Sequence, residues 1–185
     1  MAVRQSRWVK HMPQTETPEQ YQQRFASYVA GKDPLEMQRA APGTLLRLIA
    51  GIADEKLRRR PAPQKWSILE IVAHLAEDEL TTSWRYRQMI ELPGVTLMGF
   101  NQDLWAQLGD YASWTLRDAV EMFRLLRESN LRLLSRLTPE QWASPGHHSE
   151  RGPISVRDLA RHMAAHDINH ILQIERILAG NGHSA

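Results

Sequence analysis

The fold and the chemistry of this chain are decided by one stretch near its C-terminus, 161-RHMAAHDINH-170, in which histidines recur at every fourth position. Residues i and i+4 lie on one face of an α-helix, so two of these histidines can bind one metal ion. Three cannot, because His162 and His170 lie about 12 Å apart along a helix axis. On a helical wheel His166 and His170 share the inward stripe with Met163, whereas His162 lies on its flank. We expect His166 and His170 to form the inward pair, with His162 peripheral or supporting the site.

A third ligand has to come from another helix, since metal sites of this kind commonly use three protein ligands. His74 is the candidate, at the border of the apolar arc of a helix predicted to begin at Ser67. The alternative for His74 is that it is a solvent-exposed histidine without a ligand. The alternative for His166 and His170 is that they are hydrogen-bonded histidines of the core or of an interface. One turn after His74, Asp78 could orient the site or act as a base. The competing interpretation of Asp78, which we weight more heavily, is a surface ion pair with Arg85 or Arg87.

The remaining histidines lie outside the predicted helices. His147 and His148 belong to a polar loop that precedes the last helix and could touch a ligand at one end of the fold, although loop histidines are usually only solvated. His11 and His183 lie near the termini and receive no role.

Helical periodicity dominates the chain, and no alternating strand pattern is present. The predicted helices are a short one from Thr17 towards Gly31, a region after Asp33 that Pro42-Gly43 breaks or restarts, and long ones over 67–92, 116–137 and 155–180. A long connection with a short helical turn is expected over 95–115. Capping boxes, S-x-x-E at 67–70 and S-x-x-D at 155–158, open two of the long helices. The pattern predicts an all-α four-helix bundle over residues 33–185, preceded by an extension, residues 1–32, with a short helix.

The amino-acid composition limits the classes of function, partner and cellular location that we expect. The 185 residues are 42% hydrophobic and 24% charged, with a formal net charge of only +2, so nucleic-acid binding is not expected. Cysteine is absent, which excludes disulfides, thiolate zinc sites and a cysteine nucleophile. No apolar run approaches the ~20 residues of a membrane span, and no secretory signal is recognised. We therefore expect a cytoplasmic protein that binds neither nucleic acid nor membrane.

Several motifs together resemble the DinB/YfiT-like superfamily over roughly residues 33–180. They are Lys65-Trp66-Ser67-Ile68, His74-Leu75 with Glu79, Gly152-Pro153-Ile154-Ser155-Val156 with Asp158-Leu159, and His166-Asp167-x-x-His170-x-x-Gln173-Ile174. The resemblance implies a four-helix bundle in which three histidines hold a divalent metal ion, here His74, His166 and His170. Members that are similar include S-transferases that use small thiols such as mycothiol or bacillithiol, a related isomerase, and probable metal-dependent hydrolases.

Three functions follow as hypotheses. The first is a transferase that activates a low-molecular-weight thiol at the three-histidine site, where the sulfur must come from a cosubstrate because the chain has no cysteine. The second is a metal-dependent hydrolase that uses water, and the third is a non-catalytic metal-binding or small-ligand-binding stress protein. An all-imidazole site suits zinc or nickel first, and iron or copper as alternatives. The expected partners are a small-molecule substrate, a small thiol cosubstrate, and a second copy of the chain in a homodimer.

Overall fold

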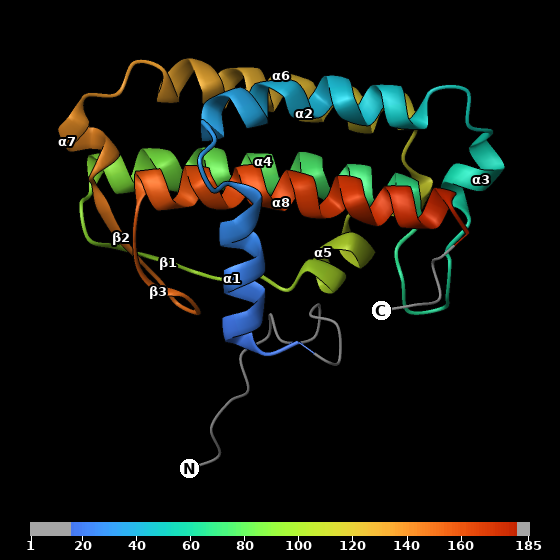
Figure 1. The fold of residues 1–185 in the computed structure, drawn as a ribbon, viewed down its shortest axis with the longest axis horizontal. Helices are drawn as coiled ribbons and strands as arrows, with labels where there is room; N and C mark the ends of the chain where they lie inside the picture. The colour runs from blue at the N-terminus through green and yellow to red at the C-terminus, as the bar shows by residue number, and fades with distance from the viewer. Residues whose placement is uncertain (1–15, 181–185) are drawn as a thin grey trace, which may run out of the picture.

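The computed structural model describes residues 16–180, which form eight α-helices and one small sheet (Figure 1). His11 and His183, and residues 1–15 of the expected N-terminal extension, lie outside this range. In chain order the elements are α1 (Pro18–Tyr28), α2 (Pro34–Ile49), α3 (Asp54–Arg58), α4 (Ile68–Glu91), β1 (Val95–Leu97), α5 (Gln102–Leu108), the 3-10 turn η2 (Tyr111–Ser113), α6 (Leu116–Leu134), α7 (Pro139–Trp142), β2 (Pro145–His148), β3 (Gly152–Ser155) and α8 (Val156–Leu178).

Four long helices, α2, α4, α6 and α8, run along the longest axis of the molecule (Figure 1). The α2 and α6 helices form one layer, and α4 and α8 form the other. The main packing contacts join α4 to α6, α2 to α8, α2 to α6 and α4 to α8. The consecutive pairs α2 and α4, and α6 and α8, therefore lie diagonally across the bundle, whereas α4 and α6 are adjacent. The predicted four-helix bundle and the short additional helix before it are both confirmed.

The ends of two bundle helices follow from local sequence. Ser67 caps α4 and Ser155 caps α8, each through the reciprocal capping box that the sequence predicts. The expected break at Pro42 is wrong, because α2 continues through this residue to Ile49. Proline removes one backbone hydrogen bond, but Ala41 and Leu45 on either side of it are buried, so tertiary packing holds the helix together.

The expectation that the loops contain no strands is also wrong. Val95 pairs with Gly146 in a parallel ladder, and His148 pairs with Gly152 in an antiparallel one, so β2 is the central strand. These strands have three or four residues each, and β2 and β3 are rich in proline, glycine and histidine, so no extended apolar alternation is present. The sheet joins the segment after α4 to the segment before α8 at one end of the bundle (Figure 1).

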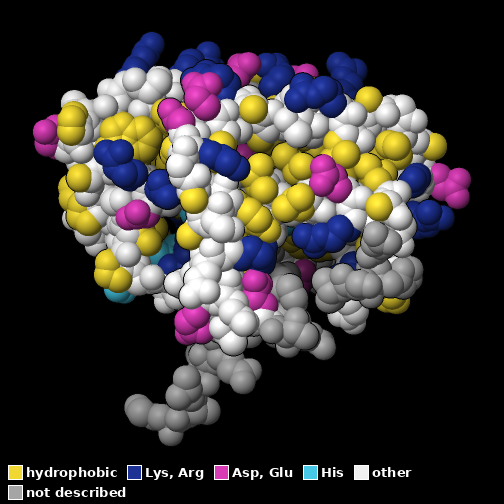
Figure 2. Space-filling view, in the orientation of Figure 1, with side chains coloured by type: hydrophobic (Ala, Val, Ile, Leu, Met, Phe, Trp, Pro, Cys, Tyr) yellow, Lys and Arg dark blue, Asp and Glu magenta, His cyan; other side chains and the backbone are white. Residues whose placement is uncertain are grey.

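The α1 helix crosses α8 steeply on the outside of the bundle (Figure 1). Phe25 and Val29 are buried against Ala164 and Ala165, whose small side chains let the two helices approach closely. The visible face of the molecule carries Lys and Arg interspersed with Asp and Glu (Figure 2). Within residues 16–180, no helix combines the length and the apolar character that crossing a bilayer requires.

Candidate metal centre and adjoining pocket

Three histidines converge between α4 and α8. Nε2 of His166 lies 3.2 Å from Nε2 of His74 and 3.1 Å from Nε2 of His170. One ligating nitrogen from each ring lies within 4.8 Å of the other two, and all three side chains are buried. The structure therefore brings together the three residues that the sequence singled out, and His74 is buried rather than solvent-exposed.

This set of nitrogens fits a divalent metal ion better than a hydrogen-bonded cluster. A nitrogen of a neutral imidazole either donates one proton or accepts at one lone pair. Nε2 of His166 can therefore form a hydrogen bond to only one of its two neighbours at a time, whereas a cation placed among them would accept all three lone pairs. Burial, together with neighbouring His170, lowers the pKa of His166 well below its usual value, which favours the neutral ring that a metal requires.

Neighbouring groups orient two of the rings. Oε1 of Gln173 lies 2.9 Å from Nδ1 of His170. Because a carboxamide oxygen only accepts hydrogen bonds, Nδ1 of His170 carries the proton and Nε2 keeps its lone pair. Nδ1 of His166 faces Oδ2 of Asp78 at 3.6 Å. The Trp66 ring packs against His74 with their centroids 4.8 Å apart.

Asp78 is buried beside this centre, with 8% of its surface exposed. The surface ion pair that we had weighted more heavily is wrong, because Arg85 donates to the carbonyl oxygen of Met98 and Arg87 donates to Ser83. Burial raises the pKa of Asp78 to about 6, although the positive charge of Arg85 opposes this shift. A carboxylate with such a pKa, close to His166, can exchange a proton near neutral pH.

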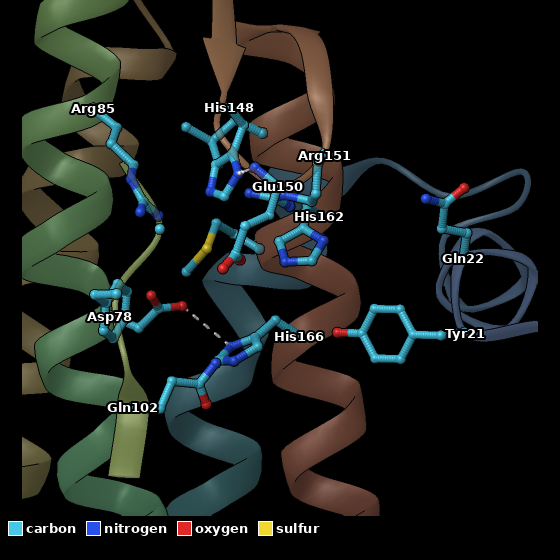
Figure 3. A pocket seen from close by; sticks show the side chains of 14 residues that line it. Tyr21, Gln22, Asp78, Arg85, Gln102, His148, Glu150, Arg151, His162 and His166 are labelled. Carbon is cyan, nitrogen blue, oxygen red and sulfur yellow. Dashed lines mark hydrogen bonds and ion pairs between the residues drawn. The ribbon is translucent and has the colours of Figure 1, made fainter. Parts of the chain in front are cut away.

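A pocket of about 110 Å³ opens next to Asp78 and His166 (Figure 3). Its walls come from α1, α4, α5, α8 and the loops of the sheet; the polar and charged lining residues are Tyr21, Gln22, Asp78, Arg85, Gln102, His148, Glu150, Arg151, His162 and His166. Of the two loop histidines, His148 is buried in the pocket wall, whereas His147 points to the exposed side of β2. His162 also lines the pocket and stacks on Phe25 with their ring centroids 5.2 Å apart, away from the three-nitrogen cluster.

A buried ionic network behind the histidines was not anticipated. Arg127 of α6 donates to Asp167 at 2.7 and 2.9 Å and to Glu79 at 2.8 Å. Asn130 donates to the other oxygen of Glu79 at 2.9 Å. Burial raises the pKa of Asp167 to about 6, and Arg127 opposes this shift. The sequence signal for this network is Arg127, a charged residue that lies in the apolar stripe of α6 one turn after Phe123.

Comparison with known proteins places the chain among bundles of this kind. The sequence profile of the DinB superfamily matches residues 37–174. A relative from Oceanobacillus iheyensis, named "Putative metal-dependent hydrolase", is 26% identical over 136 residues, which cover 74% of this chain and 78% of the relative. A solved structure, described as "YfiT from Bacillus subtilis is a probable metal-dependent hydrolase with an unusual four-helix bundle topology", superposes with a TM-score of 0.73 at 16% identity and covers 89% of each chain. At this identity the second likeness concerns the fold alone.

Proposed function

Because the chain belongs to the DinB superfamily, we propose that it is a divalent-metal-dependent enzyme that holds its metal with His74, His166 and His170. The observation that carries this proposal is the convergence of three buried Nε2 atoms, with contacts of 3.1 and 3.2 Å. The names of the Oceanobacillus relative and of YfiT support metal dependence. Zinc or nickel is the metal we expect first, because all three ligands are imidazoles.

The residues of this chain have separable tasks in the proposed site. The three histidines would hold the ion, and Gln173 would keep the His170 ring in the tautomer that can bind it. Asp78 would accept the proton that an incoming nucleophile loses, and the pocket beside it would hold the substrate. With three neutral ligands, a bound divalent ion supplies a Lewis acid that lowers the pKa of a thiol or water entering the site.

Our first candidate reaction is transfer of a low-molecular-weight thiol to an electrophile. The chain contains no cysteine, so the nucleophilic sulfur would arrive with the cosubstrate. Hydrolysis is the second candidate, and the names of both relatives favour it. A homodimer remains a separate prediction, which sedimentation analysis would test.

The decisive test compares metal-loaded and chelator-treated protein with generic electrophiles and esters, each with and without bacillithiol, mycothiol or cysteine. Thiol transfer requires turnover that depends on both metal and thiol, and a change in the visible spectrum of the cobalt-loaded protein when thiol is added. Turnover that needs metal but no thiol would establish hydrolysis instead. Stoichiometric metal without turnover and without a spectral response to any ligand would favour a non-catalytic metal-binding protein.

A further inference from the structure

Three hydrogen-bond donors line the end of the pocket away from the helical histidine pair. Arg85 comes from α4, His148 from β2 and Arg151 from the turn that follows β2. Figure 3 shows these side chains along one rim of the pocket, with Asp78 and His166 below them. Arg85 lies far from His148 and Arg151 in the sequence, and the small sheet and α4 bring the three side chains together.

The backbone determines which nitrogen of His148 can donate. The amide N–H of Glu150 donates to Nδ1 of His148 at 3.2 Å. A nitrogen that accepts carries no proton, so the neutral ring of His148 must carry its proton on Nε2. The imidazole is therefore a donor at its other edge, like the two guanidinium groups beside it.

Neither arginine forms a close ion pair within the described chain, although the carboxylates of Asp78 and Glu150 partly offset their charge from farther away. Within residues 16–180, neither forms an ion pair with a carboxylate within 4.0 Å, and Arg151 makes no hydrogen bond. Arg85 uses one nitrogen for the carbonyl oxygen of Met98 at 2.6 Å. Placing two cations together in a partly buried pocket costs free energy unless an anion offsets their charge.

The two carboxylates of the pocket act on the arginines only from beyond ion-pair distance. Asp78 faces His166 at 3.6 Å. The carboxyl group of Glu150 packs over Gly99, so closely that a Cβ built on this glycine would lie 2.8 Å from the carboxyl carbon. The rim formed by Arg85, His148 and Arg151 therefore keeps hydrogen-bond donors available to an anion that would bind closer to them than Asp78 or Glu150 does.

We propose that Arg85, His148 and Arg151 bind an oxyanion group, a carboxylate or a phosphate, of a small-molecule substrate or cosubstrate. Guanidinium groups match the planar geometry of such oxygens and can donate two parallel hydrogen bonds, and the Nε2–H of His148 adds a third donor. The inference rests on the proposed function in one respect, since it places the reacting part of the same molecule next to His166 and Asp78. The oxyanion site itself requires no metal.

Calorimetric titration of the full-length protein with malonate and with inorganic phosphate tests the site, using metal-loaded and metal-stripped samples. We expect saturable binding in both samples, weakened about tenfold or more by Arg151→Gln and by Arg85→Gln, because each substitution removes charge-assisted hydrogen bonds. Arg87→Gln is the matched control, since Arg87 contacts only its own helix at Ser83 and should change the affinity less than about twofold. Stronger binding of malonate identifies a carboxylate substrate, and stronger binding of phosphate identifies a phosphorylated one.

Arg151→Gln is the more informative variant, because the Arg151 guanidinium supports no other described part of the fold. Metal content and the thermal midpoint are measured for every variant, so that a folding defect is recognised. The proposal is overturned if the wild type binds neither anion saturably, or if Arg151→Gln and Arg85→Gln bind as tightly as the Arg87→Gln control. Normal anion binding in a protein that never retains metal would contradict the proposed function and leave the oxyanion site standing.

Discussion

Arg127 holds Asp167, the residue directly after His166, by two parallel hydrogen bonds of 2.7 and 2.9 Å. The same guanidinium donates to the carboxylate of Glu79 on α4 and to the backbone oxygen of Gln38 on α2. One side chain of α6 therefore contacts all three other bundle helices. The hydrogen bonds of Arg127 fix the rotation of α8 about its own axis, so that His166 and His170 face α4.

Replacing Arg127 by Met should destabilise the protein by about 3–5 kcal/mol, because it leaves the carboxylates of Glu79 and Asp167 buried without their cation. Urea denaturation monitored by circular dichroism measures the change. Arg124→Met is the control on the same helix: Arg124 pairs only with exposed Glu121 and Glu128, so its loss should cost less than about 1 kcal/mol. Equal effects of the two substitutions would contradict the structural role assigned to Arg127.

Replacing His74, His166 or His170 by Ala should abolish stoichiometric metal retention, since two imidazoles seldom hold a divalent ion firmly. His162→Ala should largely preserve it, because His162 stacks on Phe25 outside the cluster of ligating nitrogens. Elemental analysis after dialysis decides between these outcomes. Should the His162→Ala protein lose its metal as completely as the other three, the assignment of the ligand set is wrong.

His148 should make the stability of the protein depend on pH. Burial, with Arg151 and Arg85 nearby, lowers its pKa to about 3, whereas the unfolded chain titrates near ~6.5. Between these values the unfolded state binds a proton that the native state does not, so the contribution to stability is complete above pH ~6.5 and is lost as the pH falls.

The measurement is the free energy of unfolding at pH 7.5 and pH 5. We expect the wild type to lose on the order of 1 kcal/mol more than His148→Gln across this interval. Exposed His147, substituted in the same way, should reproduce the wild-type pH profile. An unchanged profile in His148→Gln would show that the ring titrates alike in both states.

Two glycine substitutions should have opposite effects. A Cβ on buried Gly146 would meet Met89 at 3.0 Å and Leu97 at 3.2 Å, so Gly146→Ala should cost roughly 1–3 kcal/mol through overpacking. In α2, a Cβ on Gly43 meets only a terminal nitrogen of Arg47 at 3.4 Å, and Gly43→Ala should stabilise by roughly 0.5–1 kcal/mol. Thermal denaturation of the two variants checks the sign of each change.

The helices and the histidine cluster could be predicted because their signals are local. The capping boxes at Ser67 and Ser155 locate two helix starts, and the four-residue spacing of His166 and His170 places both on the inner face of one helix. The rotation of that helix is also readable from its apolar stripe. These predictions need no knowledge of which segments meet in space.

The strands and the pocket could not be predicted because they depend on long-range pairing. Nothing in the sequence around Val95 indicates that it pairs with Gly146, since three residues are too few to establish a strand period and β2 has none. Arg85 and Arg151 acquire a shared role only once that pairing has formed. The burial of Asp78 could not be predicted for the same reason, because the segments that cover it come from distant parts of the chain.

The hairpin of β2 and β3, which carries His148 and Arg151, is separate from the four long helices of the bundle. The helices carry the three histidines that we propose as metal ligands, whereas the β2–β3 hairpin carries His148 and Arg151 of the pocket wall. If the proposed site is catalytic, substitutions in this hairpin should change which compound binds while the three histidines stay in place. One helical bundle can thereby accept different small molecules without changes to the residues of its proposed metal site.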